Sequence, residues 1–450
     1  MKKKLFFVMA AMTLSGAMLS CSSSDDDVDL GEAKAVVNML SDPIPIELTE
    51  EQWEFVDDNN RFTLNFLKTV NEVDQTGKSY IYSPLSITYV LGMVNDAATG
   101  QTEKELEETL GFHEGGIQAV NDFCKKLIDG LPKVDEKVTL DIANAIFVNK
   151  SYTLKKQFEQ DMQSYYDAKA EALDFSSPQT LDRINGWCNE KTNGMIPEIL
   201  DGVDPSMMSY LLNAIYFKAD WASKFDEKNT RNEAFITPSG FTQLPMMHQK
   251  VLIQYINISS MYSAVKIPYG NGMWNMMVLL PKEGFTADDI INQLAAYGLS
   301  EVEGVIPCAT GMSKEEINAH RFSPHEVDLK LPRFETSSDT DKLDIEKGLV
   351  GLMQKMGIKL AFNSYFAEIP NMCEAPVYID MMRQKAKIKV NEEGSEAAAV
   401  TVAGMMEIFA GGGGPIEYPK ATFHANRPFV YVIQEASSGV ILFVGKLTGM

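Results

Sequence analysis

Hydrophobic and polar residues alternate with two different periods along the chain. Apolar residues at three- and four-residue spacing predict a helix over 51–72, and an almost wholly apolar helix over 84–93 is expected to be buried. The other predicted helices cover 97–112, 158–166, 181–188 and 349–356. Period-two alternation or short apolar runs predict strands over 140–148, 210–217, 264–269, 274–281 and 327–334. Most helices precede a series of strands and hairpins, so the pattern predicts an α+β fold and not alternating β-α-β units.

A few polar positions interrupt these apolar elements. Asn213 is the polar residue of the strand over 210–217, and Asn144 is the polar member of one face of the strand over 140–148. A buried asparagine needs hydrogen-bond partners, although an asparagine in a strand more often marks an edge or a bulge. Ser83 and Pro84 fit the N-cap and the first turn of the helix that follows them.

The stretch over 389–402 is unusual for a loop. A strand runs up to Val390, and two glutamates and Gly394 then interrupt it as a hinge would. Read as a strand, the residues that follow present one small, uncharged face: Ser395, Ala397, Ala399 and Thr401. Such a face could enter a packed core without overpacking it. The pattern indicates a segment with two positions, a loop and a strand. The alternative, an alanine-rich surface helix, is disfavoured by the β-branched residues over 400–402.

The composition is that of a globular protein. Of the 450 residues, 45% are hydrophobic and 23% are charged, which is enough for a large core in one to three domains. The formal net charge of −22 argues against binding to nucleic acid or to anionic membranes. Five cysteines without a CxxC spacing predict neither a disulfide framework nor structural zinc, and each is interpreted as a small buried apolar residue.

Sequence motifs for catalysis or cofactor binding are missing. The chain contains no HExxH, G-x-S-x-G, GxxxxGK[ST] or GxGxxG. His320 and His325 lie near Glu326 and could ligate a metal, but this short polar segment fits an ordinary surface better. We therefore predict no enzymatic activity, no cofactor and no metal site.

The N-terminus has the features of a targeting segment. A basic start and an apolar stretch predict a signal peptide over 1–20, and Cys21 then resembles the lipidated cysteine of a bacterial lipoprotein. Residues 21–50 include an acidic run and are predicted to be a flexible tether. These features predict an extracytoplasmic lipoprotein on the outer membrane or cell surface of a Gram-negative bacterium, with the lipid as its only membrane contact. The alternative is an ordinary secretory signal with a chance cysteine.

The segment after Val390 resembles the hinge of the reactive-centre loop of serpins. The matching hinge residues are Glu392, Glu393, Gly394, Ser395, Glu396, Ala397, Ala398 and Ala399. The likeness returns over 80–112, 423–429 and 439–446, and spans about 55–450 with an apparent insertion over 301–326. It implies a serpin domain over 51–450, with helices packed around three β-sheets and an exposed reactive-centre loop at about 392–422.

The resemblance also implies an activity, that of a serine protease inhibitor that acts as a suicide substrate. The target protease would cut the loop and form an acyl-enzyme, and the cleaved loop would then insert into the central sheet of a metastable fold. Family spacing from Glu392 places the cut between Ile408 and Phe409, with Met405 and Met406 as alternatives.

These loop residues favour target proteases with apolar primary pockets, either elastase-like or chymotrypsin-like, with papain-like cysteine proteases as a further class. The protease would be the one macromolecular partner of a monomer that binds no nucleic acid. Two alternatives are a non-inhibitory serpin-fold binding protein on the cell surface, and an enzyme or glycan-binding lipoprotein with another fold.

The family's shutter region, which controls opening of the central sheet, matches four positions of this chain: Ser83, Ser86, Asn213 and Gln384. Many members have a histidine where this chain has Gln384. Because glutamine also donates and accepts hydrogen bonds, the exchange implies a changed pH dependence and not a loss of function.

Overall fold

The computed structural model describes residues 34–35, 44–112, 115–257, 260–299, 322–395 and 417–449. Several predicted features lie outside these residues: the signal segment, Cys21, His320, the hinge residues from Glu396 to Ala399, and the predicted cleavage positions Met405, Met406, Ile408 and Phe409. In the described residues, no helix has both the length and the apolar character needed to cross a membrane.

The helices gather mainly in the first half of the chain, as the periodicity predicts. They are α1 (Glu50–Val73), α2 (Pro84–Ala97), α3 (Gly100–Leu110), α4 (Gly116–Gly130), α5 (Lys156–Tyr166), α6 (Gln179–Lys191), α7 (Ala287–Tyr297) and α10 (Leu349–Met356). Helix α1 begins at a capping box, in which Thr49 and Gln52 exchange side-chain and backbone hydrogen bonds. Helix α2 is buried on nearly all sides, as expected from its apolar sequence.

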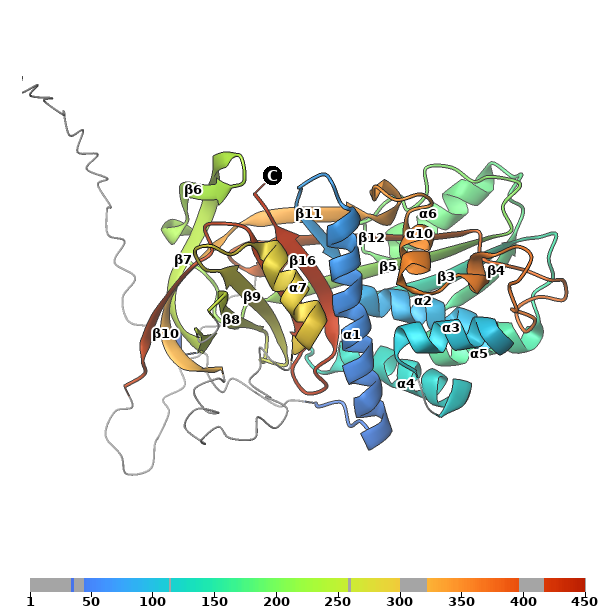
Figure 1. Ribbon diagram of the computed structural model, residues 1–450, viewed down its shortest axis with the longest axis horizontal. Helices are drawn as coiled ribbons and strands as arrows, with labels where there is room; N and C mark the ends of the chain where they lie inside the picture. The colour runs from blue at the N-terminus through green and yellow to red at the C-terminus, as the bar shows by residue number, and fades with distance from the viewer. Residues whose placement is uncertain are drawn as a thin grey trace, which may run out of the picture.

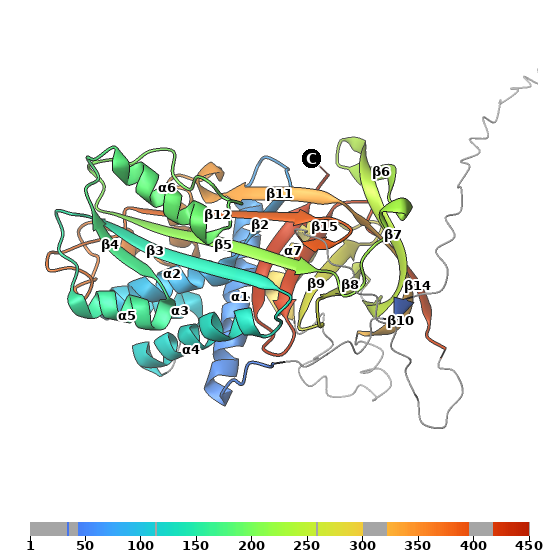
Figure 2. The ribbon, with the colours of Figure 1, turned by 180° about the vertical axis from the view of Figure 1, so that it is seen from behind.

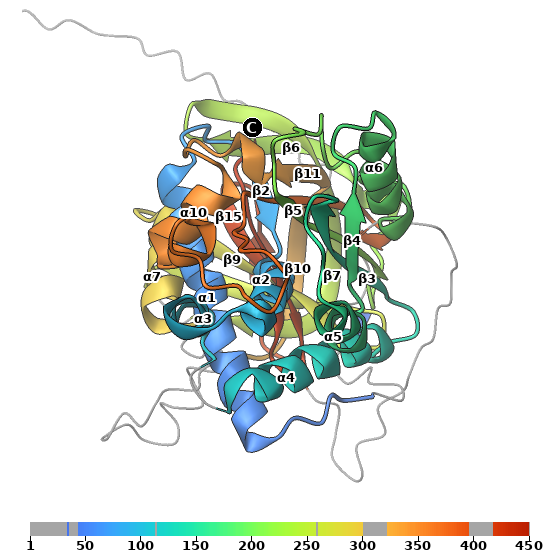
Figure 3. The ribbon, with the colours of Figure 1, turned by 90° about the vertical axis from the view of Figure 1, so that its right-hand side faces the viewer.

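A six-stranded sheet runs along the long axis of the molecule (Figures 1 and 2). Its strands, in spatial order, are β11 (Phe334–Asp339), β12 (Met381–Val390), β13 (Gly394–Ser395), β5 (Ser209–Asp220), β3 (Thr139–Asn149) and β4 (Lys169–Leu173). Figure 3 shows α6 on one side of this sheet and α1, α3 and α10 on the other. Each face of β3 and β5 therefore has its own core, a large one under α1 and α2 and a smaller one under α6.

The remaining strands form a ten-stranded sheet. Its main path is β14 (Lys420–His424), β10 (Ser323–Pro332), β7 (Gly240–Ile256), β8 (Tyr262–Tyr269), β9 (Trp274–Pro281), β15 (Phe429–Glu435), β16 (Ile441–Leu447) and β2 (Tyr80–Tyr82). Strands β6 (Arg231–Thr237) and β1 (Lys34–Ala35) also pair with β7. The three expected sheets are thus joined into two hydrogen-bonded units, because the 17 residues of β7 pair with β6 over 240–246, with β10 over 246–255 and with β8 over 254–256.

The expected α+β fold is confirmed, and so is the hairpin of β8 and β9. The predicted N-cap is wrong in one respect, because Ser83 precedes α2 without accepting a hydrogen bond from the helix backbone. Its Oγ lies 3.0 Å from Ser86 Oγ, since both hydroxyls are buried beneath the sheet where a polar partner is needed.

Candidate functional site

The two central strands of the six-stranded sheet are paired at one end and separated at the other. Strands β12 and β5 pair in parallel from Met381 opposite Tyr210 to Lys385 opposite Ala214. At the other end, β13 lies between them, with Ser395 opposite both Val390 and Ala219. In the described part of the chain, no strand occupies the four rows between, 386–389 on β12 and 215–218 on β5. The first two residues after the hinge glutamates therefore already form the start of a central strand.

Gly394 and Ser395 fit this position because they are small. A Cβ added to Gly394 would lie 2.1 Å from the carbonyl oxygen of Ala219, and the φ of Gly394 is +156°. Ser395 is fully buried on the core side, and its Oγ lies 2.7 Å from the hydroxyl of Tyr269. That tyrosine stacks on Trp221, with ring centroids 4.3 Å apart. A larger residue at position 395 would have to displace this aromatic pair.

Side chains of opposite charge hold the two glutamates that precede β13, of which Glu392 is buried and Glu393 partly exposed. Glu392 is 3% exposed and accepts hydrogen bonds from Arg333 at 2.5 and 3.0 Å and from Thr230 at 2.5 Å. Burial opposes ionisation of this carboxyl, but the bonds from Arg333 and Thr230 lower its pKa below the ordinary value. Glu393 pairs with Lys224, and Trp221 Nε1 donates to the carbonyl of Asn391 at 2.8 Å. The turn into β13 is thus held by side chains from three other segments.

We expect Arg333→Ala to lower the free energy of the first unfolding transition by about 1–2 kcal/mol at pH 7. Removing one partner of a buried ion pair costs more than this, but Arg333 is 43% exposed, which reduces the effect. Because the pKa of Glu392 is lowered by folding, the contribution is complete above the unfolded pKa and is lost as pH falls through the lowered folded pKa. Urea unfolding of both proteins at pH 7 and in acid measures the difference.

The matched control for this prediction is Arg61→Ala, which removes an exposed arginine whose partner Asp58 lies one helical turn away. It should change stability by only a few tenths of a kcal/mol. A destabilisation by Arg333→Ala that stays the same in acid would show that Glu392 is not its cause.

The four residues that the shutter resemblance implies lie close together where β12 and β5 are paired, next to the four rows that no described strand occupies. Gln384 is fully buried, and its Nε2 donates to the carbonyl of Ser83 at 2.8 Å and to Asn213 Oδ1 at 3.0 Å. Its Oε1 accepts from the backbone N–H of Ser83 at 3.1 Å. This amide links α2 to β12 and β5, and none of the four side chains changes charge at neutral pH.

Two more residues complete this cluster, and the sequence reasoning had not included them. Asn144 Oδ1 accepts from Asn213 at 2.9 Å, because the two asparagines lie opposite each other on β3 and β5. Thr340 Oγ1 accepts from the backbone N–H of Gln384 at 3.0 Å. Asn144 could have been found as a polar residue in an apolar strand, whereas nothing in the sequence distinguishes Thr340.

The described cysteines are the buried apolar residues that the sequence predicts. Cys124, Cys188 and Cys373 are free and buried. Burial raises the pKa of the Cys124 and Cys188 thiols to about 12 and that of Cys373 to about 11. Thiols with such values hold little thiolate at neutral pH and are poor nucleophiles.

Comparisons with a family model, with related sequences and with solved structures all indicate the same protein family. The family model described as "Serpin (serine protease inhibitor)" matches residues 57–449. The human leukocyte elastase inhibitor is 30% identical over 397 residues, which cover 87% of this chain and 98% of that protein. Among solved structures, the thermophilic serpin tengpin covers 94% of this chain and 98% of its own, with a TM-score of 0.73 and 24% identity. Human thyroxine-binding globulin covers 88% and 98%, with a TM-score of 0.71 and 25% identity, and was solved in complex with thyroxine.

Proposed function

Because this chain belongs to the serpin family, a family of serine protease inhibitors and not of enzymes by its description, we propose that it traps its target protease as a suicide substrate. In this proposal the protease cuts the reactive-centre loop and stays attached as an acyl-enzyme. The cut loop then enters the six-stranded sheet between β12 and β5 and carries the protease across the molecule. The observation that supports this most directly is β13, which holds the first two residues of such a strand in register with both neighbours.

The register supports further insertion. Continuing from Ser395, residues 396–399 would fill the four open rows without breaking any pairing of β12 with β5. Residues 400–404 would then replace the paired rows, and residue 404 would meet Met381 and Tyr210, which already oppose each other. Because both neighbours give the same register, an entering strand would bond to both of them without a bulge.

The side chains match this register. On the core side, Ala397 would lie opposite Ile388 and Phe217, where a small apolar residue is needed. Thr401 comes four residues after Ala397 on the same face of the strand, so it would lie in the row of Gln384 and Asn213. A hydroxyl would thus meet two buried amides, so their hydrogen-bonding capacity would not be left unsatisfied when β12 and β5 part.

The residue types of the reactive-centre loop indicate which class of protease is the target. No lysine or arginine occurs between Gly394 and Tyr418, so trypsin-like proteases are disfavoured, and the proposed cut between Ile408 and Phe409 suits elastase-like or chymotrypsin-like pockets. The 30% identity to an elastase inhibitor supports the same choice. We further propose a monomer that Cys21 anchors, through its lipid, on the outside of a Gram-negative cell.

The second candidate is a non-inhibitory binding protein with the serpin fold, for which the likeness to thyroxine-binding globulin is the supporting observation. The small, uncharged inward face of the proposed insert favours inhibition.

The proposal predicts an SDS-stable complex when the full chain is incubated with leukocyte elastase or chymotrypsin, and none with trypsin. Mass spectrometry of the released C-terminal peptide identifies the cut bond, which should lie between Ile408 and Phe409 or next to Met405 or Met406. Cleavage in the loop by both enzymes, without a complex and with full protease activity afterwards, would favour the non-inhibitory candidate.

A further inference from the structure

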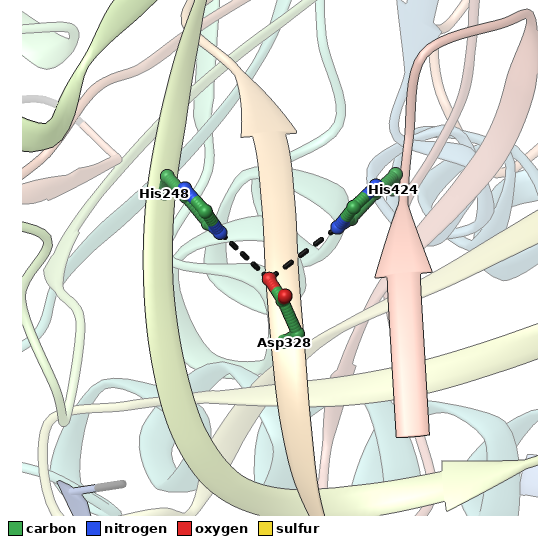
Figure 4. Close-up of side chains that lie close together, drawn as sticks. All are labelled: His248, Asp328 and His424. Carbon is green, nitrogen blue, oxygen red and sulfur yellow. Dashed lines mark hydrogen bonds and ion pairs between the residues drawn. The ribbon is translucent and has the colours of Figure 1, made fainter. Parts of the chain in front are cut away.

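Three side chains with metal-binding chemistry converge on one face of the ten-stranded sheet (Figure 4). His248 lies on β7, Asp328 on β10 and His424 on β14. Asp328 Oδ1 is 2.6 Å from His248 Nε2 and 3.3 Å from His424 Nε2, and the three ligand atoms all lie within 4.8 Å of one another. It is the one such group in the residues that the structure describes. No local sequence pattern indicates this group, because the histidines lie 80 and 96 positions from Asp328.

The register of three adjacent strands makes this convergence. Lys330 on β10 lies opposite His248 on β7 and opposite His424 on β14, and Asp328 is two residues before Lys330 on the same face. Both imidazoles therefore flank the β10 strand and reach diagonally toward the carboxylate. The ammonium of Lys330 is bound by both carboxylate oxygens of Glu233 at 2.9 Å, so its charge is compensated from β6.

We propose that His248, Asp328 and His424 bind a divalent transition-metal ion, with Zn²⁺ the best fit. Two imidazole nitrogens and one carboxylate oxygen are ligands that Zn²⁺ takes, and a water would complete a tetrahedral site. Ligand atoms about 2.05 Å from a tetrahedral Zn²⁺ lie about 3.3 Å apart. His424 already lies at that distance from Asp328, and His248 would have to move back by about 0.7 Å.

A metal ion can reach the three side chains from solvent. The side chains of His248, Asp328 and His424 are 14%, 36% and 34% exposed, so the ion can arrive from solvent.

A bound ion would fasten the strand that follows the reactive-centre loop. Within the described residues, β14 is the last strand on the path of its sheet and pairs over five positions with β10 alone. The metal would add a cross-link from β14 to both β10 and β7, close to where the chain returns from the loop. This consequence concerns the strand itself and holds whether or not the chain inhibits a protease.

The test is titration of the full, metal-free chain with ZnCl₂ by calorimetry, and with CoCl₂ by visible absorption. The wild type should bind one equivalent of either metal, and tetrahedral Co²⁺ should give d–d bands. His424→Gln, His248→Gln and Asp328→Asn should each weaken binding at least about tenfold. The matched control is His325→Gln, because His325 is on β10 but outside the group, and it should bind as the wild type does.

Hydrogen exchange gives a second readout. Zn²⁺ should slow exchange of the amides over 420–424 in the wild type and in His325→Gln but not in His424→Gln. Circular dichroism establishes that each variant is folded. The proposal is overturned if the folded wild type binds no metal, or if all three site variants bind as tightly as the control. If the wild type binds the metal but inhibits no protease, the proposed function is contradicted and the metal site is still supported.

Discussion

Ser395→Arg should convert the protein from an inhibitor into a substrate. Ser395 is already fully buried on the core side of β13 in the intact protein, and it would stay at the start of the strand that the cleaved loop extends. An arginine there would bury a charge without a partner beside Tyr269, at a cost of several kcal/mol, and each 1.4 kcal/mol slows insertion tenfold relative to hydrolysis of the acyl-enzyme. We expect the loop to be cut at a normal rate, almost no SDS-stable complex to form, and the stoichiometry of inhibition to rise at least about tenfold. Gel electrophoresis and residual protease activity measure both quantities.

The matched control carries the same arginine one position later. Glu396 is expected on the opposite face by strand alternation, toward the row of Lys389, which is exposed. Glu396→Arg should therefore still form the complex with nearly unchanged stoichiometry. If Ser395→Arg traps the protease as efficiently as Glu396→Arg, insertion through the gap between β12 and β5 is not how this chain inhibits.

Cleavage of the loop in the intact protein should raise its thermal stability sharply. Filling the open rows and replacing the paired ones would add about a dozen backbone hydrogen bonds, each worth about 0.5–1.5 kcal/mol, or on the order of 10 kcal/mol in all. For a chain of this size we expect the melting temperature to rise by roughly 10 °C or more. Circular dichroism melts of intact and cleaved protein at one fixed scan rate compare the two, since the proposed metastable fold would unfold under kinetic control.

The same cut in Ser395→Arg is the control for this melt. Both proteins lose the same peptide bond, but only the wild type can insert the freed strand, so the variant should melt within a few degrees of its own uncut form. Equal melting temperatures for cut and uncut wild type would mean that the native fold stores no conformational energy.

Most of the fold could be predicted from the sequence, because periodicity is a local property. The apolar run of α2 and the two apolar faces of β3 are readable from about ten residues each, and both proved buried. The predicted cap by Ser83 failed because a buried hydroxyl nearby, that of Ser86, competes for it across the helix start. Local preference could not foresee that choice.

Part of the candidate site could also be predicted from the sequence, and the rest depends on the tertiary structure. The sequence alone determined the helices, the strands and the family resemblance. It also predicts the hinge, since a glycine followed by small residues is a local composition.

Only the tertiary structure decided that Gly394 and Ser395 lie between β12 and β5, and that Arg333 reaches Glu392 from 59 positions away. It also decided that Asn144 supports Asn213 from 69 positions away, and that two histidines meet Asp328. Those contacts depend on strand register, which is set when distant segments pack against one another and which no local pattern encodes.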